Sequence, residues 1–131
     1  WASTDTGGDA TDGHGSFCTA SYIEAQRAGC LLALGRLNRA VQIYEATVPA
    51  IPPVYRRDRG VALARLASAY ALAGDLEQSA QTATDALHLA ESTGSVRTLR
   101  EVHVVGQRLR SQPRTPSVTR LLGELAESAH P

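Results

Sequence analysis

The chain has 131 residues, of which 13 are basic and 13 acidic, so its formal net charge at pH 7 is zero. This length corresponds to one domain, and a hydrophobic content of 43% is enough for a core. The balanced charge gives no general attraction to nucleic acid, and no stretch approaches the roughly 20 apolar residues of a membrane span. The chain contains no methionine, so we expect it to begin inside a longer protein.

Residues 1–16, WASTDTGGDATDGHGS, are rich in Gly, Asp, Thr and Ser and almost lack aliphatic side chains. Such a segment cannot bury enough apolar area to offset the entropy that it would lose on ordering. We therefore expect a flexible arm or loop at 1–16 and a folded domain at 17–131.

Cys18 and Cys30 would lie roughly 18 Å apart on a single helix, which is too far for a disulfide. Free thiols fit a reducing compartment, so we expect a cytoplasmic protein.

The stretch ALAGDLEQSAQTATDAL, residues 71–87, predicts that one helix ends and the next begins almost at once. Gly74 suits the left-handed residue that follows a helix end. Asp75 can cap the second helix, with Gln78 as its partner three residues on. The same join recurs in ALGRLNRAVQIYEATV, where Gly35 takes the part of Gly74.

The recurrence has a fixed step of 39 residues. Small residues recur at this step in the first helix of each pair: Ala28, Ala67 and Gly106. Two sets recur in the second helices: Ala40, Ser79 and Val118, then Thr47, Ala86 and Leu125. In the third copy Pro113 ends a helix, and Thr115 with Pro116 starts the next. Three copies of a helix pair predict an all-α helical solenoid, whose helices cross closely at the small residues.

The segment LARLASAYALAGDLEQSAQTATDALHLA, residues 63–90, resembles a tetratricopeptide repeat. The matching consensus positions are Leu66, Ala67, Tyr70, Gly74, Asp75 and Ala86. More narrowly, residues 20–127 resemble the C-terminal repeats of actinobacterial helix-turn-helix (XRE-type) transcriptional regulators. The resemblance implies a right-handed superhelix of about three antiparallel helix pairs, and a DNA-binding domain upstream. The step of 39 exceeds the usual tetratricopeptide period of 34.

In solenoids of this family the first helices of the pairs line a concave groove. Projected onto this chain, the groove positions are Tyr22, Ala25, Gly29 and Leu32, then Val61, Ala64, Ser68 and Ala71, then Arg100, His103, Gln107 and Arg110. Opposite the last set, Leu99, Val102, Val105 and Leu109 form the expected core face. The groove thus begins small and apolar and ends basic. Two interpretations of the basic end stay open: a solvated helix face, or an anion contact for an acidic partner.

No catalytic, metal or cofactor site is expected. Asp9, Asp12 and His14 could supply metal ligands, but they lie among glycines in the expected arm. No nucleophile elbow or phosphate-binding glycine loop is present. Residues 95–120 carry six arginines against one glutamate. No aromatic residue is interleaved to stack on bases, so we expect no direct nucleic-acid contact.

We therefore expect a module that binds a protein or peptide, and not an enzyme. It would be the regulatory or sensor part of a cytoplasmic transcriptional regulator, holding a partner helix or a signalling peptide in its groove. The alternative is a structural homodimerisation module with no separate ligand. No membrane partner is expected.

Overall fold

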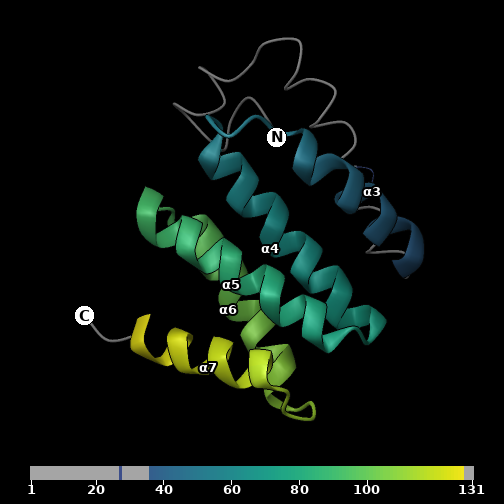
Figure 1. Ribbon diagram of the computed structural model, residues 1–131, viewed down its shortest axis with the longest axis vertical. Helices are drawn as coiled ribbons and strands as arrows, with labels where there is room; N and C mark the ends of the chain where they lie inside the picture. Colours follow the sequence, from purple (N-terminus) through teal and green to yellow (C-terminus); the bar gives the residue numbers. More distant parts are fainter. Residues whose placement is uncertain (1–26, 28–35, 129–131) are drawn as a thin grey trace.

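A computed structural model describes Arg27 and residues 36–128 of the chain. Residues 36–128 are all-helical and contain no strand, which confirms the all-α class for this part (Figure 1). The helices are α3 (Leu37–Ala50), α4 (Arg56–Ala73), α5 (Leu76–Thr93), α6 (Val96–Arg110) and α7 (Pro116–Ser128). The arm expected at 1–16 and the first helix of the first pair lie outside the described residues.

The join between α4 and α5 has the predicted geometry. Gly74 follows the last residue of α4 with φ 87°, in the left-handed region where a Cβ would be strained. Asp75 caps α5, because its Oδ1 accepts a hydrogen bond from the Gln78 backbone N–H at 3.3 Å. The predicted start of α7 is also confirmed, since Thr115 Oγ1 accepts from the Val118 N–H at 3.2 Å.

The repeat found in the sequence corresponds to equivalent places in the packing. The second helices α3, α5 and α7 begin at Leu37, Leu76 and Pro116, steps of 39 and 40 residues. All six repeated positions of these helices are buried: Ala40, Ser79 and Val118, then Thr47, Ala86 and Leu125. In the first helices Ala67 and Gly106 are buried as well. Ala28 lies outside the described residues.

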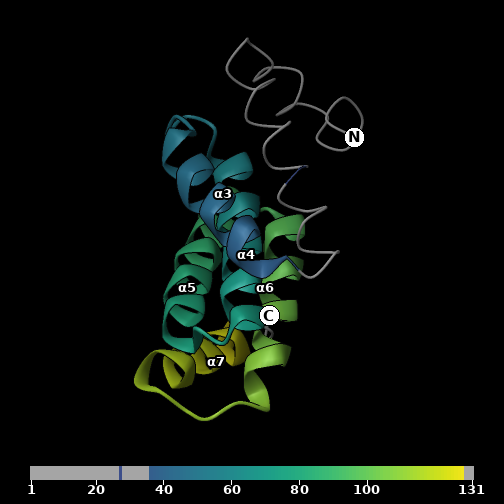
Figure 2. The same ribbon diagram turned by 90° about the vertical axis from the view of Figure 1, so that its right-hand side faces the viewer.

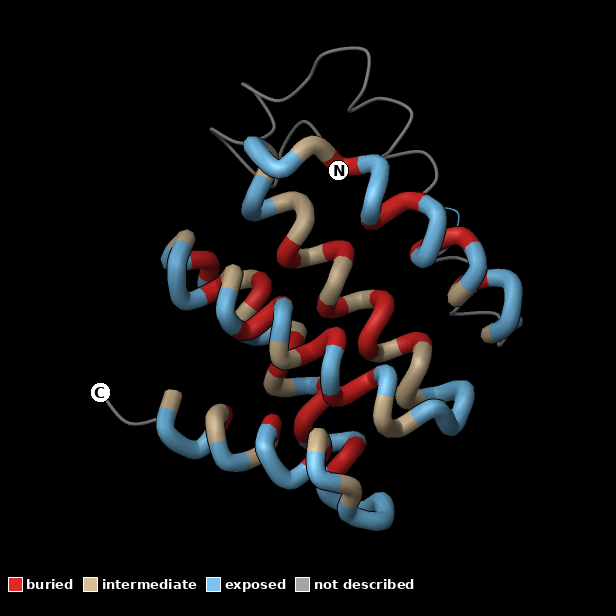
Figure 3. The backbone as a smooth tube through the Cα atoms, viewed as in Figure 1, coloured by how far each residue is buried: buried red, intermediate tan, exposed pale blue. Residues whose placement is uncertain are grey.

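Helix α4 has a core on two sides, which is why its buried positions run almost around it (Figure 3). Towards α5, α6 and α7 it contributes Ala64 and Ala67 to the larger cluster. Towards α3 it contributes Ala62, Leu66 and Ala69 to a second cluster around Tyr44. The alanines let neighbouring backbones come close while still burying apolar surface.

Each helix from α3 to α6 packs on the next helix, and α4 also packs on α6 and α5 on α7 (Figures 1 and 2). The contacts of α4 with α6 and of α5 with α7 join helices that are one repeat apart. A Cβ added at Gly60 of α4 would lie 3.1 Å from Oγ1 of Thr98 on α6. A Cβ added at Gly106 of α6 would lie only 2.5 Å from Cδ1 of Leu125 on α7. The close crossing predicted at Gly106 is therefore present, against α7.

The basic stretch at 56–59 has a different role from the one that its sequence suggests. In the sequence RRDR, Asp58 is a candidate helix cap, but α4 begins at Arg56, with Tyr55 at the cap position. Asp58 therefore lies in the first turn, where a carboxylate favours the positive end of the helix dipole. Arg57 donates to the Thr93 carbonyl at the end of α5, at 2.6 Å. The stretch thus ties the start of α4 to the end of α5.

Alanine substitutions at two helical glycines test the close crossing. Gly123→Ala on α7 should stabilise the fold by about 0.5–1 kcal/mol, because alanine is the better helix former and the site is open. Gly106→Ala gains the same propensity but must displace buried Leu125, an overpacking cost of about 1–3 kcal/mol. Urea denaturation measures both. Equal stabilisation by the two substitutions would contradict the packing of α6 on α7.

Candidate partner-binding surface

The structure distributes the projected groove residues over different environments. Val61 and Ser68 are partly exposed on α4, and Arg100, Gln107 and Arg110 are exposed on α6, with His103 partly exposed. Ala71 is also partly exposed. Tyr22 and Leu32 lie outside the described residues, as do Ala25 and Gly29. The structure therefore describes only the α4 and α6 parts of the projected groove.

Ala64 does not line an open surface. It is 0% exposed and belongs to the core cluster that contains Val102 and Val105 of α6. Gly60, Ala64 and Ala67, spaced by four and three residues, share the side of α4 that meets α6. A small side chain is needed there because the two helices cross closely, so Ala64 is a packing residue.

The open side of α4 is turned slightly from the projected one. It carries Val61, Arg65, Ser68 and Leu72, whose spacing of four, three and four places them on one helical face. Leu72 is 40% exposed, which is unusual for a leucine in this fold. This strip runs beside α6, since α4 and α6 are in contact.

On α6 the open side is centred near Val104, which is 46% exposed. Arg100, Gln107 and Arg108 lie within about 60° of Val104 around the helix, at 3.6 residues per turn. His103 and Arg110 lie about 100–120° away from Val104, on the flank nearer Gly106 and α7. Around the helix, Arg100, His103, Gln107 and Arg110 therefore span about 80° on one flank of Val104, whereas Arg108 lies on the other flank. We call Val61, Arg65, Ser68 and Leu72 of α4 with Arg100, Val104, Gln107 and Arg108 of α6 the α4–α6 face.

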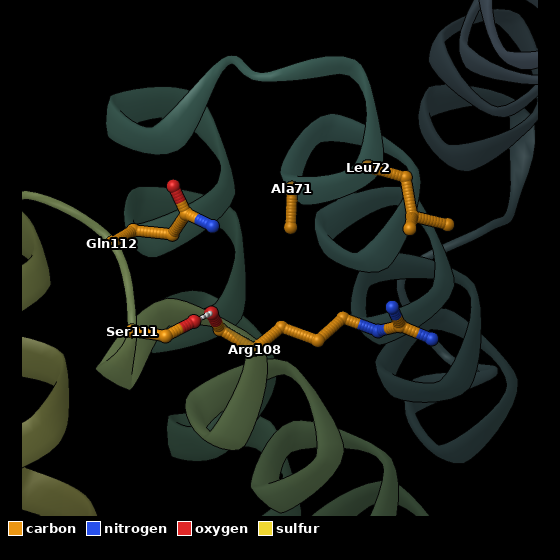
Figure 4. Close-up of a pocket in the computed structure, with 5 residues that line it drawn as sticks. All are labelled: Ala71, Leu72, Arg108, Ser111 and Gln112. Carbon is orange, nitrogen blue, oxygen red and sulfur yellow. Dashed lines mark hydrogen bonds between the residues drawn. The ribbon is translucent and has the colours of Figure 1, made fainter.

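A hollow of about 310 Å³ lies at one end of the α4–α6 face, between the last turns of the two helices (Figure 4). It is lined by Ala71, Leu72, Arg108, Ser111 and Gln112. The Arg108 side chain extends from α6 towards Leu72, and Ser111 Oγ donates to the Arg108 carbonyl at 3.2 Å. The sequence projection missed Arg108, because the projected register selected Gln107 and Arg110 on either side of it.

Several arginines of the chain are engaged in the fold, and those of the α4–α6 face are mostly not. Arg59 donates to the Ile51 carbonyl, and Arg114 to the Leu109 and Arg110 carbonyls. The guanidinium groups of Arg100 and Arg108 take part in none of the hydrogen bonds or ion pairs seen among the described residues. Both side chains are exposed.

Arg65 and Glu101 neighbour the phenol of Tyr44, at the edge of the α4–α6 face. Burial raises the pKa of Tyr44, and the Arg65 charge partly offsets that effect. Because Arg65 and Glu101 carry opposite charges close to one phenol, they largely balance each other. The excess positive charge of the face therefore lies at Arg100 and Arg108.

A second polar cluster joins α5 to α7. The His88 ring shares a hydrogen bond with Glu124 at 2.8 Å, and Arg120 donates to Glu124 at 3.1 Å. The His88 hydrogen bond is the main cause of the lowered pKa of Glu124. Ser117 donates a hydrogen bond to Glu77, so this contact is separate from the hydrogen bond between His88 and Glu124. The His88–Glu124 and Ser117–Glu77 contacts link helices one repeat apart, and no local spacing in the sequence could have indicated them. Arg120 and Glu124 are four residues apart on α7.

Comparisons with protein families, with characterised proteins and with solved structures give no match to this chain. Over the described residues, no group of three or more His, Cys, Asp or Glu side chains is arranged to hold a metal ion. The candidate ligands Asp9, Asp12 and His14 lie outside that part. Of the helices described, none has both the length and the apolar character that crossing a membrane requires.

Glu124 gives the α5–α7 contact a pH dependence. Its pKa is lowered in the folded chain, so its carboxylate stabilises the fold above the ordinary glutamate range and loses this effect as pH falls through the lowered value. The wild-type chain should be more stable than the Glu124→Gln variant at about pH 5–7. The difference should be no more than about 1 kcal/mol, because solvent screens the interaction with the half-exposed His88.

The difference should shrink as pH falls through the lowered pKa of Glu124, because the carboxylate is then protonated in both the folded and the unfolded chain. Thermal melts across this range provide the measurement. Glu91→Gln, at an exposed position of α5, is the matched control and should show no such trend. A difference for Glu124→Gln that stays constant with pH would be the contrary result.

Proposed function

We propose that the chain is a protein- or peptide-interaction module that holds its partner on the α4–α6 face. The observation that carries the proposal is the combination of exposed apolar and unengaged cationic side chains on one face. Leu72 and Val104 are each at least 40% exposed. Arg100 and Arg108 lie four residues before and after Val104 on α6, and the Arg108 side chain extends towards Leu72. Apolar contact would supply most of the affinity, and the arginines would orient the partner.

The repeat supports a finer architecture, which is part of the proposal. Equivalent buried residues at a step of 39, and contacts between helices one repeat apart, are what a stacked solenoid of antiparallel helix pairs requires. In a right-handed superhelix of this kind, α4 and α6 are successive first helices and would line the concave side. The resemblance of residues 63–90 to a tetratricopeptide repeat favours the same arrangement.

The biological setting rests on the sequence resemblance. Similarity to the C-terminal repeats of helix-turn-helix regulators favours a regulatory or sensor module of a cytoplasmic transcriptional regulator. The coding region upstream of Trp1 tests this directly. A helix-turn-helix there would support the assignment, and an unrelated domain would contradict it.

Homodimerisation is the second candidate, favoured by the same exposed Leu72 and Val104. In a homodimer these side chains would be covered by a second copy of the chain, leaving no free face for a ligand. Sedimentation velocity separates the two, because only the dimer changes mass with protein concentration.

An aspartate substitution on the α4–α6 face should abolish partner binding. The probes are peptides selected against the wild-type chain from a displayed library of random 12-residue sequences. They should bind the Val104→Asp variant at least tenfold more weakly than wild type, because a charge replaces an apolar contact. Val96→Asp is the matched control, since Val96 is an exposed valine of the same helix at 64%. Isothermal titration measures both.

Retained binding by Val104→Asp, or equal loss with Val96→Asp, would contradict the location of the partner. A wild-type dimer that Val104→Asp turns into a monomer would favour homodimerisation.

A further inference from the structure

We infer that the hollow between the ends of α4 and α6 is an anchoring subsite for an aliphatic residue followed by an acidic residue of a partner peptide. This inference rests on the proposed interaction function and assigns it a ligand chemistry. It moves the anion contact from Arg110, which the sequence projection selected, to Arg108.

The apolar side of the hollow fits one aliphatic side chain. Ala71 and Leu72 form it, and Leu72 is 40% exposed in the free chain. A volume of about 310 Å³ exceeds what one leucine side chain fills, so room remains for a carboxylate beside it. Covering Leu72 removes apolar surface from water on both partners, which favours binding.

The polar side of the hollow selects an anion. Arg108 and Gln112 present side-chain hydrogen-bond donors there, while the Ser111 hydroxyl donates to the Arg108 carbonyl. No acidic residue lines the hollow. The guanidinium can bond a carboxylate through two parallel N–H groups, which gives direction as well as attraction. A lysine in the partner would meet only like charge.

The helix ends do not cancel this preference. The last turns of α4 and α6 carry partial negative charge on their carbonyls. Most of these carbonyls near the hollow are already bonded: Ala71 accepts from Gly74, Tyr70 from Asp75, Arg108 from Ser111, and Leu109 from Gln112. The full charge of Arg108 therefore dominates the field that a ligand meets.

Arg100 extends the subsite along α6. It lies eight residues before Arg108, which is about 12 Å along the helix. An extended peptide covers that distance in about four residues, and its side chains alternate sides with a period of two. An acidic residue at the anchor and another four positions away would therefore reach Arg108 and Arg100 from the same side of the peptide.

A synthetic peptide tests the subsite on the whole chain. The probe is acetyl-Leu-Glu-Ser-Gly-Ser-Glu-amide, titrated into ¹⁵N-labelled protein and followed by amide shifts. Shifts should concentrate at Ala71, Leu72, Arg108, Ser111 and Gln112. A peptide with lysine at both glutamate positions, and one with serine in place of leucine, should each bind at least fivefold more weakly.

Two arginine variants separate this subsite from general charge attraction. Arg108→Gln should weaken the probe about tenfold, the loss expected for one charged hydrogen-bonded contact. Arg110→Gln removes the same charge two residues away, on the flank nearer α7, and should change affinity less than twofold. Both positions are exposed, and circular dichroism checks that both variants keep their helices.

Equal weakening by the two variants, equal binding of the lysine peptide, or shifts that avoid the hollow would each overturn the inference. Failure here is distinct from failure of the proposed function. If the selected peptides need Val104 but ignore Arg108→Gln, the interaction face stands and the subsite falls. If the probe binds at the hollow while the selected peptides ignore Val104→Asp, the subsite stands and the proposed face falls.

Discussion

Small residues at the helix contacts allow α4 to pack against α3, α5 and α6 at once. Gly60 meets Thr98 of α6 so closely that a Cβ there would lie 3.1 Å from the threonine hydroxyl. Ala64 and Ala67 lie on the same side of α4 and share one core cluster with Val102 and Val105. Larger side chains at these positions would push the first helices apart. The distance between α4 and α6 in turn sets the width of the surface that both helices expose.

The α4–α6 face is a consequence of that close crossing. The buried sides of α4 are taken up by its neighbours, while the strip of Val61, Arg65, Ser68 and Leu72 stays partly open on a helix that contacts α6. Some arginines elsewhere are held by carbonyls and carboxylates, as Arg57 is by Thr93 and Arg120 is by Glu124. Arg100 and Arg108 have no such contact within the described residues, so the proposed function assigns their charge to a partner.

The sequence predicts the features that depend on local or periodic chemistry. The roles of Gly74 as the left-handed residue after α4 and of Asp75 as the cap of α5 were predicted correctly. Helix caps need particular residues at fixed offsets, so the sequence alone indicates them. The 39-residue step finds buried Ser79 and Leu125, since packing repeats with the helix pair. Ala64 was placed on an open face because groove positions were projected from the family resemblance, whereas its side chain is buried in the core of this chain.

Contacts between distant residues could not be predicted from the sequence. Arg57 bonds a carbonyl 36 residues away, and His88 bonds Glu124 across the same separation. Neither pair has a local spacing signal.

The closeness of the first helices is tested most directly by nuclear Overhauser effects across their crossing. The structure predicts a strong effect between the Hα protons of Gly60 and the γ-methyl group of Thr98, because the position of a Cβ on Gly60 lies 3.2 Å from that methyl carbon. A second strong effect is expected between Gly106 Hα and the δ-methyl groups of Leu125. Absence of the Gly60–Thr98 effect in an otherwise assigned spectrum would contradict the close packing of α4 on α6, and with it the α4–α6 face.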